Sequence, residues 1–191
     1  MTASSQRPRT AGRPPGFDRP AVLGVAMDLL WNGGVEATPV GELISAMGLS
    51  RSSFYTAFGS KRGVMLAAIR LYSRQGLDLL SDISQRPEGS QEKLRDLVRT
   101  LAMIDEERGC FVVNCITELG RHDGEVRQIA ASHNAEVERI VADALPEGSD
   151  ADRSARARGL VSAAYGATLL KSAGTDRAAI REMLDALVDR A

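Results

Sequence analysis

The sequence predicts an all-α protein in which a small N-terminal unit of short helices precedes a larger helical body. Ala, Leu, Arg and Glu are plentiful and aromatic residues make up 4% of the chain, which favours helices over strands. Apolar residues recur at helical spacing between glycine and proline stops, and no segment alternates in the manner of a strand. With 191 residues, 43% of them hydrophobic and 26% charged, the chain is long enough to bury a globular core.

The first part of the chain divides into an arm and a helix. Residues 1–17 are rich in proline and arginine and have no helical period, so we expect a flexible basic arm. Helical spacing begins at Asp18, and the glycine pair Gly33-Gly34 stops the helix. Its apolar face is expected to consist of Val22, Ala26, Leu29 and Leu30.

Two short helices joined by a glycine turn come next. Thr38 supplies a capping hydroxyl, Pro39 takes the first helical position, and Gly48 ends this helix. Ser50 caps the second helix and Gly59 ends it. Short helices are marginal alone, so neighbouring helices must hold this pair in place. The positions predicted to face inward are Val40, Leu43, Ile44, Met47, Phe54 and Phe58.

The rest of the chain is expected to form longer helices. Ser60 caps a helix that runs past Leu80 and stops before Pro87. We predict further helices around the apolar positions of 94–101, 110–119, 126–141, 160–168 and 180–187.

Charge is distributed unevenly along the chain. Residues 1–62 carry seven Lys or Arg against four acidic residues, a net of +3, and the rest carries 17 basic against 21 acidic residues, a net of −4. The overall charge of −1 argues by itself against a nucleic-acid binder. A basic head on an acidic body is nevertheless the asymmetry expected when only one end contacts phosphates.

The second short helix has an outward face suited to DNA. If Phe54 and Phe58 point inward, the residues left outward are Arg51, Ser52, Tyr55 and Thr56. Arginine can bind guanine in the major groove, and hydroxyl groups can bind bases or phosphates. Lys61 lies in the first turn of the next helix, where a cation is unfavourable unless a phosphate is near.

These residues carry a family resemblance. Residues 18–72 resemble the DNA-binding domain of the tetracycline-repressor (TetR) family, through GVEAT at 34–38, AMGLS at 46–50 and the spacing SxxxFYxxFGSK at 50–61. The resemblance implies a homodimer of about nine helices per chain: a three-helix helix-turn-helix domain (18–62) after the arm, then an effector-binding and dimerisation domain (63–191). It implies that residues 51–57 form the recognition helix, with Tyr55 and Lys61 on phosphates. The DNA-binding candidates are Arg13, Thr38, Arg51, Ser52, Tyr55, Thr56 and Lys61.

The basic arm has two possible interpretations. It is either a solubilising tail or an arm that enters the minor groove. Gly12-Arg13-Pro14 resembles the centre of minor-groove hooks, and an arginine fits a narrow A·T groove. Arg13 is therefore a candidate DNA contact.

The second half of the chain gives weaker signals. The resemblance implies an effector cavity among the middle helices, and the candidate residues are Tyr72, Met103, Cys110, Asn114, Thr117 and His133. It also implies a dimer interface on the last two helices. Gly159 and Gly166 would allow close helix packing there, and the alternative is a core seam within one chain. The interface candidates are Leu160, Ala164, Tyr165, Thr168, Leu184 and Leu187.

The cysteines are expected to be free thiols. Cys110 and Cys115 would point about 140° apart on one helix, at a rise of ~7.5 Å, and so could not bridge easily. Some TetR-family members that sense electrophiles or oxidants have a similar Gly-Cys pair at the start of a central helix. A thiol at a helix N-terminus is made more reactive by the dipole, so Cys110 is a candidate sensor. The alternative for both cysteines is a small apolar filler of the core.

The two histidines point to no catalytic or metal site. His133 lies on an apolar face, where it is either a hydrogen-bonded core residue or a pocket residue. His122 and Glu118 are four apart, but no further ligand stands at metal-binding spacing. Asn114 and Thr117 are either ligand contacts or a solvated edge.

We therefore predict a cytoplasmic DNA-binding transcription regulator without catalytic residues, metal, cofactor or membrane segment. The resemblance implies that it is a repressor, since repression is the usual mode of the family. Its expected partners are a palindromic double-stranded operator, a second copy of the chain, and an unknown effector or thiol-reactive signal that releases it. The alternatives are an α-helical enzyme and a protein-binding adaptor. No P-loop, GxGxxG, HExxH or Ser/His/Asp pattern supports an enzyme, and the basic arm and outward Arg51 disfavour an adaptor.

Overall fold

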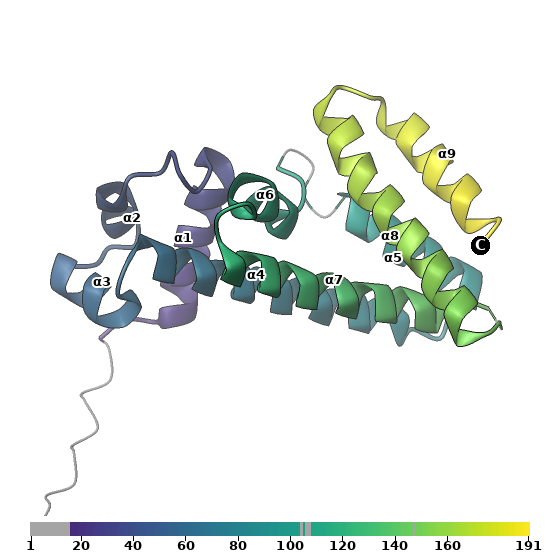
Figure 1. Ribbon diagram of the computed structural model, residues 1–191, viewed down its shortest axis with the longest axis horizontal. Coiled ribbons are helices and arrows are strands. Elements are labelled where there is room, and N and C mark those ends of the chain that lie inside the picture. Colours follow the sequence, from purple (N-terminus) through teal and green to yellow (C-terminus); the bar gives the residue numbers. More distant parts are fainter. Residues whose placement is uncertain (1–15, 104, 106–107, 147) are drawn as a thin grey trace, which may run out of the picture.

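The computed structural model describes residues 16–103, 105, 108–146 and 148–191. The predicted contact of Arg13 and most of the arm lie outside these residues. The described part of the chain is all-α, as predicted, and contains no strand (Figure 1). Its helices are α1 (Arg19–Gly33), α2 (Val40–Ala46), α3 (Arg51–Phe58), α4 (Lys61–Ser84), α5 (Ser90–Met103), α6 (Phe111–Leu119), α7 (Gly124–Ala144), α8 (Asp150–Ser172) and α9 (Arg177–Val188).

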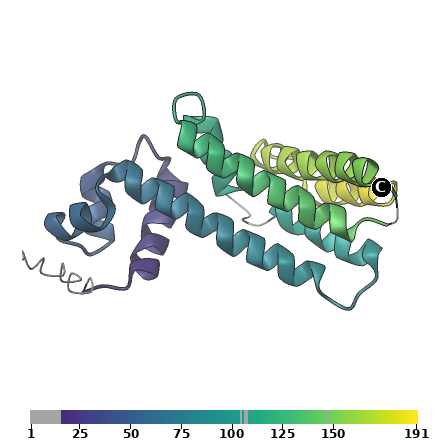
Figure 2. The ribbon, with the colours of Figure 1, turned by 60° about the horizontal axis from the view of Figure 1, so that its bottom comes forward.

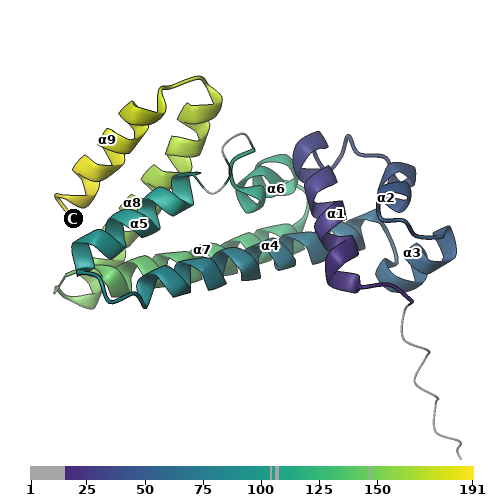
Figure 3. The same ribbon diagram turned by 180° about the vertical axis from the view of Figure 1, so that it is seen from behind.

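The helices form a small head and a longer body. Helices α1, α2 and α3 gather around the start of α4, at the end of the molecule farthest from α9 (Figures 1 and 3). α4 leaves the head and runs beside α7, while α5, α8 and α9 pack together at the other end. Figure 2 shows α8 and α9 side by side on an outer face of the body. None of the described helices is long and apolar enough to cross a membrane.

Side-chain caps fix the start of most head helices. The carboxylate of Asp18 accepts a hydrogen bond from the Ala21 amide at the start of α1. The hydroxyls of Ser50 and Ser60 accept bonds from the amides of Ser53 and Gly63, so the two predicted serine caps are confirmed. The turns after α1 and α3 need glycine, because Gly34 and Gly59 have φ of 81° and 74°.

The start of α2 differs from the prediction. α2 begins at Val40, with Pro39 at the cap position and no side-chain cap. The hydroxyl of Thr38 instead donates to the carbonyl oxygen of Gly34, four residues back, at 2.6 Å. Thr38 is 3% exposed, so this side chain closes the α1–α2 loop and cannot reach DNA. The assignment of Thr38 as a cap and as a DNA contact was therefore wrong.

The buried apolar residues form two clusters, one at each end of the molecule. The head cluster joins α1, α2 and α3 to the first half of α4. It also includes Phe111, Val112 and Cys115 of α6, which lie far along the chain from the head. The second cluster fills the space between α5, α7, α8 and α9. The predicted boundary at residues 62–63 falls inside α4, and α6 packs with the head rather than with the other end of the body.

Most of the predicted dimer contacts lie inside one chain. Leu160, Ala164, Thr168 and Leu184 are at most 7% exposed and, apart from Thr168, belong to the second core cluster. Tyr165 is half-buried and donates a hydrogen bond to Asn134 on α7 at 3.0 Å. These residues form the seam within the chain, because the larger apolar side chains of α8 and α9 face α5 and α7. Leu187, which is 38% exposed, still faces outward.

Candidate nucleic-acid interface

α3 presents a polar face that is held in place by two aromatic anchors. Phe54 and Phe58 are buried in the head cluster, at 0% and 8% exposure. Arg19 at the start of α1 stacks over the Phe58 ring at 4.7 Å, which ties α1 to α3. The outward residues are exposed, as the helical spacing predicted, and they are Arg51, Ser52, Tyr55 and Thr56.

Lys61 secures the loop beside this face. Its ammonium donates to the carbonyl oxygen of Glu36 at 3.0 Å, so it bridges the start of α4 and the α1–α2 loop. An ammonium group has three donors, and this bond occupies one of them. Lys61 therefore remains free to bind a phosphate while it holds the loop.

The predicted effector residues do not form one pocket. Tyr72 is buried in an aromatic cluster with Trp31 and Phe111, and ring centroids lie 5.1 Å and 5.9 Å from the Tyr72 ring. Met103 lines a separate hollow with Leu79 and Arg99. The amide of Asn114 donates to the Arg108 carbonyl oxygen, and the hydroxyl of Thr117 donates to the Val113 carbonyl oxygen. Both side chains are exposed, so they form the solvated edge of α6.

Cys110 stands at the N-cap of α6, as its sequence position indicated, but its environment differs from the expected one. The thiol is 4% exposed. Burial raises its pKa, and the amides of Val112 and Val113 and the Tyr72 hydroxyl lower it by less. Desolvation therefore exceeds the effect of the helix terminus, which favours the interpretation of Cys110 as a core filler over that of an activated thiolate. Cys115 is also a free, buried thiol, and burial raises its pKa to about 12.

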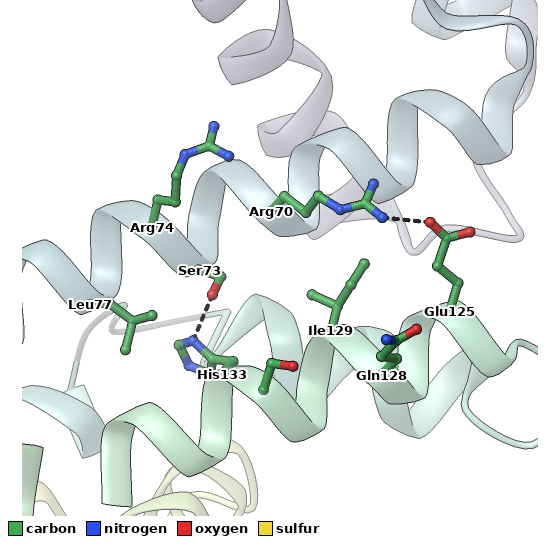
Figure 4. A pocket seen from close by; sticks show the side chains of 9 residues that line it. Arg70, Ser73, Arg74, Leu77, Glu125, Gln128, Ile129 and His133 are labelled. Atoms are coloured by element: carbon green, nitrogen blue, oxygen red, sulfur yellow. Dashed lines mark hydrogen bonds and ion pairs between the residues drawn. The ribbon is translucent and has the colours of Figure 1, made fainter. Parts of the chain in front are cut away.

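His133 belongs to a groove on the body. Its Nδ1 lies 3.0 Å from the Ser73 hydroxyl, and burial lowers its pKa to about 4. The groove runs between α4 and α7, has a volume of about 640 Å³, and is lined by both arginine and apolar side chains (Figure 4). His133 is the one predicted effector residue that lines it.

Glu118 makes a contact that the sequence did not reveal. Its carboxylate accepts hydrogen bonds from the backbone amides of Val35 at 3.0 Å and Glu36 at 2.6 Å. These amides belong to the loop between α1 and α2, whereas Glu118 lies near the end of α6. We call this contact the Glu118 clamp. It connects α6 to the loop between α1 and α2, just before the two short helices of the head.

Two further contacts join the head to the body. Arg108 stacks on Trp31 at 3.9 Å and forms an ion pair with Asp28 at 3.0 Å, both on α1. At the start of α4, Arg62 forms two hydrogen bonds with Asp123, the N-cap of α7, at 2.6 and 2.9 Å. These bonds hold the pKa of Asp123 well below its usual range. Sequence spacing could not predict these pairs, because their partners are at least 61 residues apart.

Known proteins resemble both the head and the whole chain. Residues 22–68 match the family model described as bacterial regulatory proteins, tetR family. The HTH-type transcriptional repressor ComR of Escherichia coli K12 is 30% identical over 138 residues, covering 70% of this chain and 66% of ComR, just under two thirds. YezE of Bacillus subtilis 168, an uncharacterised HTH-type transcriptional regulator, is 26% identical over 91% of this chain and 96% of its own length.

The fold agrees with these relatives. A cysteine mutant of the TetR-family regulator CifR, solved with a 26-bp double-strand operator DNA, has a TM-score of 0.70 and 27% identity. That comparison covers 94% of this chain and 97% of CifR. The chain belongs to the TetR family of bacterial regulatory proteins. It is a DNA-binding transcriptional regulator rather than an enzyme.

Proposed function

We propose that this protein is a repressor that binds a palindromic operator as a homodimer and leaves it when a small molecule binds the body. The observation that carries the DNA-binding part is the exposed face of α3, with Arg51 and Tyr55 outward over the buried Phe54. Such a short helix is suited to the major groove. ComR is described as a repressor and CifR was solved with operator DNA, which supports the same role here.

The homodimer is proposed to form through the outer faces of α8 and α9. Gly159, Ser162 and Gly166 form an exposed stripe along α8 at helical spacing, which permits close approach of a second helix. Leu169 and Leu187 are exposed by 72% and 38% on the same pair of helices. For the two heads of a dimer to bind one palindrome, their recognition helices must lie ~34–36 Å apart, which is one turn of DNA.

The signal is proposed to reach DNA through α6 and α4. The Glu118 clamp holds the α1–α2 loop, and Arg62 joins α4 to the N-cap of α7. A ligand that favours another arrangement of these helices changes the spacing of the heads and weakens operator binding. The operator weakens ligand binding by the same factor, because the two affinities are linked. We favour a small molecule over a thiol-reactive signal, since Cys110 is buried with a raised pKa.

The protein is also proposed to act in the cytoplasm, since a regulator works where the chromosome lies.

The test of operator binding is selection of genomic DNA fragments by the purified protein, followed by fluorescence anisotropy on the enriched sites across a salt series. Enrichment of a palindrome, bound by a dimer with an affinity that falls steeply with salt, is the expected result. The absence of enrichment, even after unfolding and refolding to remove a copurified ligand, would contradict the proposal.

The thiol route has its own test. Cys110→Ser is expected to leave operator binding and its release by a small-molecule effector unchanged. If the parent protein leaves the operator on treatment with a thiol-reactive compound and Cys110→Ser does not, Cys110 is the sensor and our preference for a small molecule is wrong.

A further inference from the structure

We propose that the groove between α4 and α7 binds a small molecule that has a carboxylate attached to an apolar body. This inference rests on the proposed function, because it names the chemical class of the effector. The groove has a volume of about 640 Å³, enough for a compound of metabolite size.

Two arginines one turn apart on α4 provide the positive end. The Arg70 guanidinium donates to the Glu125 carboxylate across the groove at 2.5 Å, so a carboxylate already fits against this group. Arg74 contacts none of the other side chains drawn in Figure 4 and has no ion-pair partner among the described residues. An exposed, unpaired arginine beside a carboxylate-binding arginine favours an anionic ligand.

The remaining walls suit an apolar body with few polar groups. Leu77 and Ile129 provide apolar surface from α4 and α7 (Figure 4). His133 is hydrogen-bonded to Ser73 at the base and, with a pKa of about 4, carries no charge near neutral pH. Ser73 and His133 therefore make the floor of the groove polar without adding charge to it. Recognition of the anion is left to Arg70 and Arg74.

The groove is connected to the head through Glu125. This carboxylate bridges Arg70 at 2.5 Å and Arg62 at 3.1 Å, and Arg62 also holds Asp123 at the start of α7. A ligand carboxylate at Arg70 and Arg74 would compete with Glu125 and loosen this network. Arg62 lies in the first turn of α4, where the head joins the body. A ligand in the groove would therefore alter the contacts at this junction.

The test is calorimetric titration of the DNA-free protein with straight-chain carboxylates from butanoate to dodecanoate, and with benzoate. We expect at least one to bind at millimolar concentration or below, while its neutral amide does not. Loss of a charge-assisted contact in Arg74→Gln should weaken binding by about tenfold, and Arg74→Lys by less. Arg121→Gln, at an exposed arginine outside the groove, is the matched control and should bind as the parent does.

Two outcomes overturn the inference. One is the absence of binding by every carboxylate, and the other is equal affinity for the parent and Arg74→Gln. Circular dichroism of each variant checks that the fold is retained. Operator binding is measured separately by anisotropy, with and without the carboxylate that binds. If the protein binds operator but no carboxylate, the ligand proposed for the groove is wrong and the proposed function stands. If it binds a carboxylate but no operator, the proposed function is wrong.

Discussion

At the scale of single residues, burial separates the aromatic side chains of α3 by role. Phe54 is fully buried and positions the helix, while Tyr55, the next residue, is 46% exposed. The two rings meet edge to face at 5.3 Å, so Tyr55 is partly ordered by its neighbour before any DNA is bound. If Tyr55 contacts DNA as proposed, this ordering reduces the conformational entropy that its side chain loses on binding.

Arg51 gives the first prediction. It is exposed in the first turn of α3, where the recognition helix of such proteins meets base edges. Arg51→Ala should weaken specific operator binding by about 1–3 kcal/mol and leave the fold unchanged. Anisotropy on the selected operator measures this, and Arg86→Ala, at an exposed arginine in the body, is the control. An operator affinity equal to that of the parent would refute the role of Arg51.

His133 gives a prediction about pH. Its folded pKa of about 4 lies below its ordinary value of 6.5, so the unfolded chain binds the proton more strongly. The free energy of unfolding should therefore fall as pH drops from about 6.5 towards 4, by about 2 kcal/mol between pH 7 and pH 5. Urea unfolding at these two pH values measures it. His133→Gln should remove this part of the dependence, and His122→Gln, at the exposed histidine, should not.

At the scale of elements, α6 is one of the connections between the head and the body. Its N-terminal residue Phe111 packs against Trp31 of α1 with ring centroids 5.8 Å apart. Near its C-terminal end, Glu118 holds the α1–α2 loop. A displacement of α6 would therefore move the C-terminal end of α1 and the loop that follows it. Trp31, the single tryptophan of the chain, is a natural fluorescent reporter of such a displacement.

The Glu118 clamp leads to a prediction at this scale. Glu118→Ala leaves two backbone amides without their acceptor, which costs about 1–3 kcal/mol per group that stays buried. We expect faster hydrogen exchange at Val35 and Glu36 and weaker operator binding, with unchanged exchange in α8 and α9. Hydrogen-exchange mass spectrometry measures this, and Glu92→Ala, at an exposed position of α5, is the control. Unchanged exchange in the loop would show that the clamp is not needed.

At the scale of the whole molecule, α4 and α7 link two buried cores, one in the head and one at the α8–α9 end. The head cluster contains the DNA-reading helices and α6, and the second cluster contains α8 and α9. The long shared seam of α4 and α7 joins them and carries the groove between Arg70 and His133 (Figure 4). A change in this seam can therefore alter the position of the head without unfolding either core.

The proposed dimer gives the last prediction. Leu169→Glu places a charge at a position that is 72% exposed in one chain but would be buried between two. We expect monomers in analytical ultracentrifugation, unchanged thermal stability of each chain within about 0.5 kcal/mol, and loss of tight binding to the palindrome. Leu79→Glu, at an exposed leucine of α4, is the control. A dimer that survives Leu169→Glu would place the interface elsewhere.

The sequence by itself determined the helices, their caps at Ser50 and Ser60, and the two faces of α3. These depend on residues within about four positions of one another, where spacing and propensity act directly. The tertiary structure decided the role of Thr38, the raised pKa of Cys110, the burial of Leu160 and the Glu118 clamp. Each of these depends on which distant segments pack together or on the space around one side chain. A helical pattern shows that a residue faces an apolar neighbour, but packing determines whether that neighbour belongs to the same chain or to a partner.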